Sequence, residues 1–472
     1  MRRMCCSGSA LLICVAVSAS LAAGQAKSKQ AEAPAQDFQS AVVHYNSGQL
    51  AEAVQELEPL VQRFPESFEV QELLGLVYSA EAKDRLANLH LEKATRLQPG
   101  SALARANLAI NLARLGQNDR AEAEFKKALQ IEPNSFAANH DLGEFYIKGQ
   151  KISAAIPYLK KAQVIDPSSY ANGYDLALSY FETNDLSMAR EQVRRLLARQ
   201  DAAELHNLLG EVEERSGDFI QAANEFQRAA EMDPSESNIF DWGSELLIHR
   251  TLDPAIEVFS QGRKLHGESP RLAVGLGLAL YIRGRNEDAV KAFLQATDLA
   301  PADSRAYYFL SEAYESSPTQ AGAVIQRFRR YMELQPENGK AAFYYAMALW
   351  KGREAESSGA DLEQVGSLLK KALAFDPSLT DAHLQLGNLY SHQRKYTEAI
   401  PEYRRALELD PNLPDAHYHL GQAYNHLGNK DQAQKEFQLH QQLYQRHLAD
   451  TDKRQEEVRQ FVYSVKSVPT KP

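Results

Sequence analysis

Cysteine is almost absent from this chain of 472 residues. It occurs only three times, at Cys5, Cys6 and Cys14. From residue 15 onward the sequence therefore excludes disulfide bonds, thiolate catalysis and cysteine-ligated metal sites. Such a composition suits an oxidising compartment but does not require one.

The sequence motifs of common catalytic and cofactor sites are also missing. There is no Gly-rich phosphate loop followed by Lys and Ser/Thr, no His-Glu-x-x-His pair and no Gly-x-Ser-x-Gly. The Gly275-Leu276-Gly277 stretch lacks the third glycine of a dinucleotide fingerprint, and we interpret it as helix packing. We therefore expect no enzymatic activity, no catalytic residue and no cofactor.

Histidines are concentrated near the C-terminus, but their spacing does not favour a metal site. His417 and His419 are two positions apart and would point to different sides of a helix. We interpret the whole group as packing and surface residues, and we predict no metal. The group is His383, His392, His417, His419, His426 and His440.

Positive charge is in deficit. The chain has 52 Lys and Arg against 62 Asp and Glu, a formal charge of −10. Phosphate backbones require a basic face, so we expect no nucleic-acid partner. With 44% hydrophobic and 24% charged residues, the composition is that of a folded protein.

The N-terminus has the pattern of a secretory leader. Two arginines precede an apolar run over residues 10–23, and the small-residue stretch Gly24–Ala26 follows. The run is shorter than the roughly 20 residues of a membrane span. We predict a signal peptide over residues 1–24, cleaved near Gly24–Ala26, a periplasmic or secreted chain, and no stable membrane span after processing. An uncleaved leader that holds a membrane-attached assembly factor remains an alternative.

A 34-residue period organises the rest of the sequence. Prolines recur at this interval, and the stretch 380–413 shows the pattern most clearly, with apolar residues at helical spacing at Leu384, Leu386, Leu389 and Tyr390. This period is typical of two-helix repeats stacked into a solenoid. The prolines are Pro65, Pro99, Pro133 and Pro167, then Pro377 and Pro411.

The residue types in the repeat have physical reasons. Gly387 and Ala399 are small where two antiparallel helices must approach closely. Pro411 lacks an N–H and ends the second helix. Glycines are expected to end the first helices in a left-handed conformation, and Ser101, Ser135, Ser169 and Ser304 are expected to cap the following unit. The glycines are Gly48, Gly116, Gly149, Gly217, Gly284 and Gly428.

These marks resemble the tetratricopeptide (TPR) repeat, whose pattern is an aromatic, Leu-Gly, Tyr, Ala, Phe, Ala and Pro at fixed offsets. The resemblance implies an all-α fold, a right-handed α-solenoid of about twelve helix pairs, over residues 37–447. The repeats fall near 34–67, 68–101, 102–135, 136–169, 170–202, 203–236, 237–269, 270–303, 304–338, 339–379, 380–413 and 414–447.

The segments around the array are assigned by composition. Residues 25–36 are predicted to be a flexible linker, 448–463 a C-terminal capping helix and 464–472 a disordered tail. An insertion at residues 351–361 is interpreted as a surface loop. Whether the degenerate repeat 237–269 is a hinge stays open.

The family resemblance also implies a binding face. In TPR proteins, repeat positions 2, 5, 9 and 12 of the first helix point into a concave surface, where aromatic and amide side chains can hold an extended peptide. A basic carboxylate clamp is disfavoured, because the corresponding positions include Glu69, Glu72, His140 and Glu144. The candidate peptide-binding residues are Tyr174, Phe181, Tyr281, Tyr308, Glu312, Asn388, Tyr418, Gln422 and Asn425.

The function hypothesis is a non-catalytic scaffold in the cell envelope or outside the cell, binding a protein or peptide partner. The alternative is an accessory subunit of envelope polysaccharide assembly or glycosyl-transfer machinery. Whether the array associates with itself is left open.

Overall fold

The structure, a computed structural model, describes residues 32–356 and 362–449. The predicted signal peptide and the tail at 464–472 lie outside these residues. So do residues 25–31 of the predicted linker, 357–361 of the insertion and 450–463 of the predicted capping helix.

Over these residues the fold is entirely helical. Twenty-four helices and no strand are present in the described part of the chain, and the helices form twelve consecutive pairs. The predicted all-α fold of about twelve TPR-like helix pairs is confirmed. Within the same residues, no helix combines the length and hydropathy that crossing a membrane requires.

The chain divides into two compact units, one ending at Asp218 and one beginning at Phe219. The N-terminal unit contains α1 (Glu32–Asn46), α2 (Leu50–Arg63), α3 (Phe68–Ala80), α4 (Asp84–Leu97), α5 (Ala102–Arg114), α6 (Asn118–Ile131), α7 (Phe136–Lys148), α8 (Ile152–Ile165), α9 (Tyr170–Glu182), α10 (Leu186–Leu197) and α11 (Ala203–Ser216).

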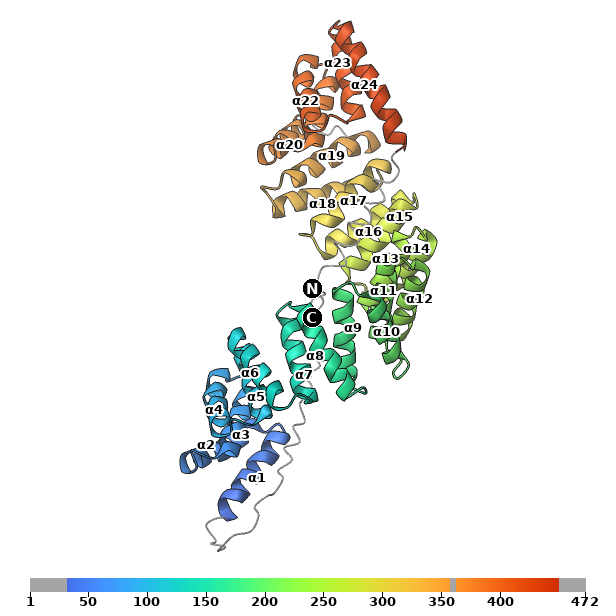
Figure 1. The fold of residues 1–472 in the computed structure, drawn as a ribbon. Helices are drawn as coiled ribbons and strands as arrows, with labels where there is room; N and C mark the ends of the chain where they lie inside the picture. The colour runs from blue at the N-terminus through green and yellow to red at the C-terminus, as the bar shows by residue number, and fades with distance from the viewer. Residues whose placement is uncertain (1–31, 357–361, 450–472) are drawn as a thin grey trace. The chain divides into compact units, whose positions relative to one another are not determined.

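The C-terminal unit holds the remaining helices of Figure 1. They are α12 (Phe219–Met232), α13 (Glu236–Ile248), α14 (Leu252–Leu265), α15 (Pro270–Ile282), α16 (Asn286–Leu299), α17 (Ser304–Ser316), α18 (Ala321–Leu334), α19 (Gly339–Glu356), α20 (Leu362–Phe375), α21 (Thr380–His392), α22 (Tyr396–Leu409), α23 (Pro414–His426) and α24 (Lys430–Ala449).

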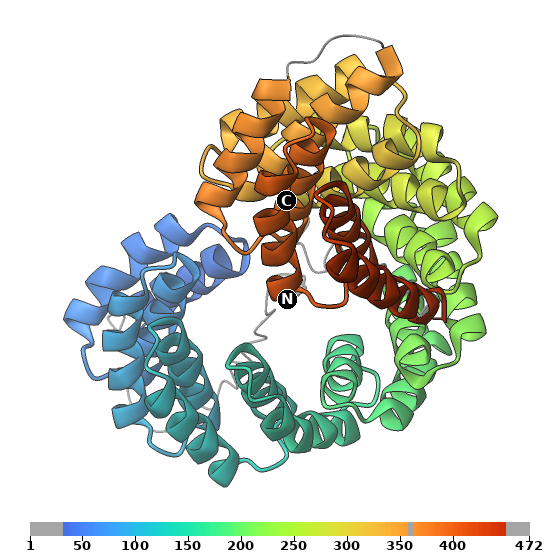
Figure 2. The same cartoon turned by 90° about the horizontal axis from the view of Figure 1, so that it is seen from above.

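Within each unit the helices stack in a regular order. A second helix such as α4 packs against its own first helix, α3, and against the next first helix, α5. First helices of neighbouring repeats, such as α7 and α9 or α17 and α19, also touch. The odd-numbered helices, here called first helices, thus form one row in each unit, as the paired ribbons of Figure 2 illustrate.

A glycine lies at the helix crossing of several pairs. A Cβ added at Gly387 would lie 2.6 Å from the ring of Tyr403, and one at Gly75 would lie 2.7 Å from Leu91. In both pairs the partner follows the glycine by 16 positions, so the close approach recurs with the repeat. The predicted role of Gly387 in close packing is confirmed.

In the turns inside the pairs that the structure describes, one residue lies in the left-handed region. Glycine occupies this place in five turns, including Gly116 with φ +74°. Other turns use Ala82, Gln150, Asn184, Arg250, Gln320 or Arg394 with φ near +60°. The expectation for Gly149 was wrong by one residue, because its φ is −81° and Gln150 takes the left-handed conformation.

Serine caps follow the predicted pattern with one exception. Ser101, Ser135 and Ser169 each accept a hydrogen bond from the backbone N–H three residues later. Ser304 is instead the first helical residue of α17, and the carboxylate of Asp303 caps that helix. Asp303 follows Pro301 by two positions, the same spacing that the capping serines have from their prolines.

Two segments expected to be irregular are partly helical. Helix α19 runs 18 residues to Glu356, so residues 351–356 are helix rather than loop. Their composition, Lys-Gly-Arg-Glu-Ala-Glu, is rich in strong helix formers. Helix α1 likewise begins at Glu32, inside the predicted linker.

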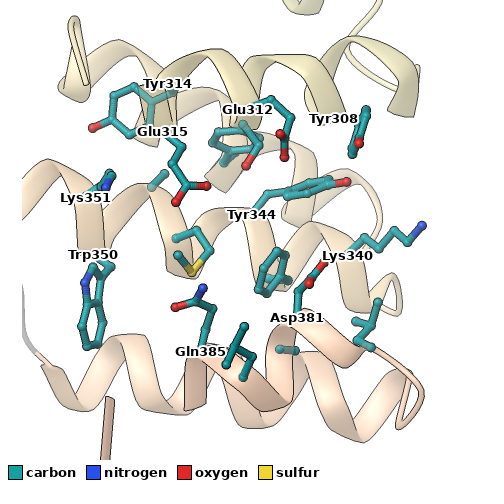
Figure 3. Close-up of a pocket in the computed structure, with 18 of the residues that line it drawn as sticks. Tyr308, Glu312, Tyr314, Glu315, Lys340, Tyr344, Trp350, Lys351, Asp381 and Gln385 are labelled. Atoms are coloured by element: carbon teal, nitrogen blue, oxygen red, sulfur yellow. The ribbon is translucent and has the colours of Figure 1, made fainter. Parts of the chain in front are cut away.

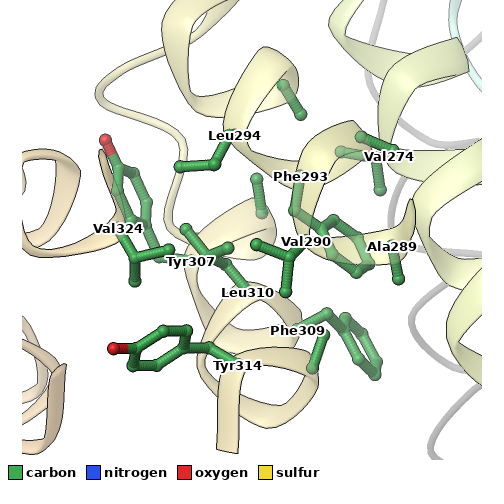
Figure 4. Close-up of a cluster of buried hydrophobic side chains, with 14 of the residues drawn as sticks. Val274, Ala289, Val290, Phe293, Leu294, Tyr307, Phe309, Leu310, Tyr314 and Val324 are labelled. Atoms are coloured by element: carbon green, nitrogen blue, oxygen red, sulfur yellow. The ribbon is translucent and has the colours of Figure 1, made fainter. Parts of the chain in front are cut away.

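The core of the C-terminal unit continues from one pair to the next. Phe293 of α16, Phe309 and Leu310 of α17 and Val324 of α18 belong to one buried cluster (Figure 4). The rings of Phe293 and Phe309 stack with centroids 6.2 Å apart. Each pair therefore depends on its neighbours to complete its core.

Substituting Gly387 tests the close approach. Gly387→Ala should destabilise the C-terminal unit by about 1–3 kcal/mol, because the added methyl collides with the Tyr403 ring. Thermal unfolding followed by circular dichroism measures the effect. Gly322→Ala is the matched control: it has open space within the same unit and should be neutral or stabilising. Equal melting temperatures for both variants would contradict a tight crossing.

The left-handed turn position gives a second test. Gln150→Gly should stabilise the protein by about 0.5–1 kcal/mol, since the left-handed penalty of a side chain exceeds the entropy that glycine adds. Gly116→Ala at the equivalent turn should have the opposite effect. Gly100→Ala, without positive φ or neighbours, serves as the control in denaturant unfolding. A Gln150→Gly variant less stable than the wild type would refute the left-handed conformation at residue 150.

Candidate functional site

A cavity of about 440 Å³ opens among the first helices of four consecutive repeats in the C-terminal unit. Its walls come from α17, α19 and α21 and from the start of α23, with Phe328 of α18 behind them. Figure 3 shows these helices crossing above and below the cavity. Such a volume fits a single large side chain rather than a whole folded partner.

Aromatic rings form much of the cavity wall. Tyr308 of α17 is 39% exposed, whereas Tyr344 of α19 is only 9% exposed. In Figure 3, Tyr308 and Glu312 lie on α17 facing the Tyr344 ring, and Trp350 lies at the other end of α19. Burial raises the pKa of Tyr344, so its hydroxyl stays neutral at physiological pH.

The charged groups of the cavity wall are mainly acidic. Its carboxylates outnumber its ammonium groups by four to two. The carboxylates are Glu312, Glu315, Asp381 and Asp415, and the ammonium groups are Lys340 and Lys351. Carboxylates beside aromatic faces are the combination that attracts a cation.

The amides next to the cavity are held in place. Gln385, in the cavity wall, accepts a hydrogen bond from Asn388 Nδ2 at 3.1 Å. The Tyr403 hydroxyl in turn donates to Asn388 Oδ1 at 2.9 Å. Asn388, a predicted binding residue, is therefore a neighbour that positions Gln385.

Of the other predicted residues in this unit, only Tyr308 and Glu312 line the cavity. Tyr281 lies against the core, with its ring 6.2 Å from that of Phe309. Tyr418 is 39% exposed and its ring packs near Phe437 and His440.

Gln422 and Asn425 lie on α23, as does Tyr418. Asn425 is exposed, and Gln422 is half-buried and hydrogen-bonds His419. Only the first residues of α23, Pro414 and Asp415, reach the cavity. The three residues thus lie on one helix but outside the cavity.

The two predicted residues of the N-terminal unit are both on α9. Tyr174 is half-buried and stacks on Tyr170 with ring centroids 6.3 Å apart. Phe181 is only 6% exposed, and the Arg215 guanidinium covers its ring at 3.7 Å. Phe181, a predicted peptide-binding residue, therefore packs in the core.

Several cavity residues were missed although a signal for them existed. Lys340, Phe343, Met347 and Trp350 occupy positions 2, 5, 9 and 12 of the repeat that starts at Gly339. The positional rule applied to that repeat would have found them. Tyr344 and Gln385 lie at position 6, outside the rule, and only the packing of neighbouring helices brings them to the wall.

His383 and His417 have a structural role. Nδ1 of His383 lies 2.7 Å from Glu402 Oε2, and its Nε2 lies 3.3 Å from the Pro377 carbonyl oxygen. His417 repeats both contacts with Glu436 and with the carbonyl of Pro411. Each ring ties the turn before a first helix to the second helix of the same repeat.

The N-terminal unit has a half-buried carboxyl group, Asp141, and a buried one, Asp175, on its first helices. Burial, reinforced by Glu144, raises the pKa of Asp141 and of Asp175 to about 7, and Lys148 partly opposes the shift. Each group therefore contributes stability below its ordinary pKa of 3.8, and this stability is lost as the pH rises to about 7.

Replacing one of these groups should change the pH dependence of unfolding. Asp175→Asn should melt close to the wild type at pH 4 and a few degrees above it at pH 8, because the neutral amide avoids burying a charge. Melting curves from pH 4 to 8 measure the difference. Asp119→Asn, at an exposed carboxylate of the same unit, is the control. A gap between Asp175→Asn and wild type that is constant across this range would contradict the burial effect.

Comparison with known families gives the identity of the repeat. Models described as tetratricopeptide repeat match residues 85–136, 106–170, 174–237, 240–304, 274–333 and 414–443, and one described as TPR repeat matches 392–428. These matches span more than half of the chain. The chain belongs to the tetratricopeptide-repeat family.

One curated relative and two solved structures are also similar. Superkiller protein 3 of Schizosaccharomyces pombe is 24% identical to the TPR chain over 195 residues, 39% of this chain but only 14% of the relative. A chain in the structure of Naa15/Naa10 bound to HypK-THB has a TM-score of 0.36 and 17% identity, covering 86% of this chain and 68% of that one.

The second structure is the C-terminal part of a TPR repeat-containing protein from Cytophaga hutchinsonii. It has a TM-score of 0.42 and 17% identity, and it covers 51% of this chain and 96% of that one. Membership of the TPR family rests on the repeat models.

Proposed function

We propose that this TPR protein is a non-catalytic scaffold that binds a segment of another protein. The observation that carries the proposal is the cavity of the C-terminal unit, which four consecutive first helices build together. Solenoids of stacked repeats present extended surfaces of this kind to their partners. The cavity wall offers ring area and charge to such a partner.

The bound segment places a Lys or Arg side chain in the cavity. A cation next to Tyr308 and Tyr344 gains from the ring faces, and Glu312 and Asp381 supply the opposite charge. A carboxylate in the same place would meet four acidic groups and only two ammonium groups. The chemistry of the wall therefore favours a basic segment over an acidic one.

The backbone of the segment has suitable partners nearby. The Gln385 amide lies in the cavity wall and is oriented by Asn388, which Tyr403 holds in turn. A preorganised amide can pair with an extended peptide backbone at little entropic cost.

We also propose that this binding takes place outside the cytoplasm. It is supported by the leader pattern over residues 1–24 and by the lack of cysteine from residue 15 onward. Mass measurement of the chain from its native cell tests it, and an N-terminus near Gln25 is the expected result. A chain that retains Met1–Ala23 would contradict export by cleavage.

Binding of basic peptides tests the cavity directly. A chain that lacks residues 1–24 is titrated with extended peptides carrying one central Lys or Arg, and fluorescence anisotropy reports the affinity. Glu312→Gln and Tyr308→Ala should each weaken binding by about tenfold or more, because they remove charge and ring area from the wall.

Tyr418→Ala is the matched control, since this tyrosine is as exposed as Tyr308 but lies outside the cavity. It should leave the affinity unchanged, and added salt should weaken binding of the basic peptide. Equal affinity for peptides with central Glu, or a larger effect of Tyr418→Ala than of Tyr308→Ala, would refute the proposal. Selective binding of glycans would favour a role in polysaccharide assembly instead.

A further inference from the structure

Three potential metal ligands meet on the first helices of the N-terminal unit. One ligand atom each of His140, Glu144 and Asp175 lies within 4.8 Å of the other two. His140 and Glu144 are one turn apart on α7, so both side chains project from the same face. Asp175 comes from α9, the next first helix, which packs against α7.

The carboxylate of Asp175 has no partner that explains its burial. The residue is 9% exposed, and its side chain makes no hydrogen bond or ion pair with any residue in the described ranges 32–356 and 362–449. Glu144 has an exposed partner, Lys148, at 2.8 Å. A buried carboxylate that lacks a donor is unfavourable unless it takes up a proton or a cation compensates its charge.

An equivalent pair elsewhere in the same unit shows what is unusual here. Glu72 and Asn107 are 35 positions apart, as are His140 and Asp175. Asn107 Nδ2 donates to Glu72 Oε1 at 3.1 Å, so that pair is complete without an ion. In the pair His140 and Asp175, the acid Asp175 takes the place of the amide Asn107. Glu144 adds a second carboxylate at the position that Leu76 occupies in the earlier repeat.

The histidine is held in the form that a metal requires. The Asn172 amide donates from Nδ2 to the Leu159 carbonyl and to Gln163, which leaves its Oδ1 as an acceptor. His140 Nδ1 lies 3.3 Å from this oxygen and therefore carries the ring proton. The lone pair is then on Nε2, as in metal sites where an outer partner fixes the tautomer.

We propose that His140, Glu144 and Asp175 form a binding site for a divalent transition-metal cation of the Zn²⁺ class. One imidazole and two carboxylates suit this class, whereas Ca²⁺ and Mg²⁺ prefer six or more oxygens. Tetrahedral coordination places ligand atoms about 3.4 Å apart for bonds of about 2.1 Å. Release of Glu144 from Lys148 supplies the movement that closes the present spacing.

The bound cation would link α7 to α9 and so fix two neighbouring repeats to each other. Three protein ligands leave a fourth position for water or for a donor from a partner. The same site would therefore both hold two repeats together and bind a ligand on the first helices of this unit.

Metal titration of the chain that lacks residues 1–24 tests the site. After treatment with a chelator, the protein is titrated with Zn²⁺ by calorimetry and with Co²⁺ by visible absorption. One equivalent should bind, and Zn²⁺ should raise the melting temperature. A tenfold excess of Mg²⁺ should not compete. Failure to bind Zn²⁺ or Co²⁺ would overturn the proposal and leave the peptide cavity of the other unit untouched.

Single substitutions locate the binding. His140→Ala, Glu144→Gln and Asp175→Asn should each weaken Zn²⁺ affinity by at least about tenfold, while circular dichroism shows a preserved fold. His44→Gln is the control, because His44 faces a single carboxylate, Glu56, at 3.2 Å. Wild-type affinity in His140→Ala, or an equal loss in His44→Gln, would overturn the assignment. So would binding of Lys-containing peptides at this site in place of the metal.

Discussion

The closest approach of two helices within a pair is the constraint on which the rest of the structure depends. At Gly387 there is no room for a methyl group against Tyr403, and Gly75 meets Leu91 in the same way. A large side chain from the second helix thus fills the space that glycine leaves on the first. Because interiors are packed to high density, this contact sets the spacing of the pair and of every pair stacked on it.

A second recurring contact joins the turn between repeats to the helix that follows. The fourth residue of a first helix donates to the carbonyl of the proline six positions earlier, as Gln71 does to Pro65 at 2.8 Å and His417 to Pro411 at 3.3 Å. Proline ends the helix but leaves its carbonyl without a helical partner. Different side chains satisfy the same backbone group, which explains why this position varies in type while the geometry is kept.

The two sites lie in different units, and in each unit the first helices supply different chemistry. In the C-terminal unit, Tyr308 is at position 5 of its repeat, and the wall of the cavity that it lines is mainly acidic. This combination suits an organic cation. In the N-terminal unit, positions 5 and 9 are His140 and Glu144, and Asp175 completes a compact set of ligands. A repeat fold can therefore carry unrelated binding sites on one regular scaffold, since the residues at a few positions of the first helices differ between repeats.

The sequence by itself determined the helix pairs, because proline, glycine and alanine at a 34-residue interval act through local sterics and close packing. It also indicated Tyr308 and Glu312, which project from one helix at fixed positions. Only the tertiary structure decided that Phe181 is buried under Arg215, that Tyr344 and Gln385 share a cavity, and that Asp175 meets His140. Those contacts join residues of different helices. The distance between two helices depends on the side chains that both contribute at their crossing, so the sequence of one helix does not determine it.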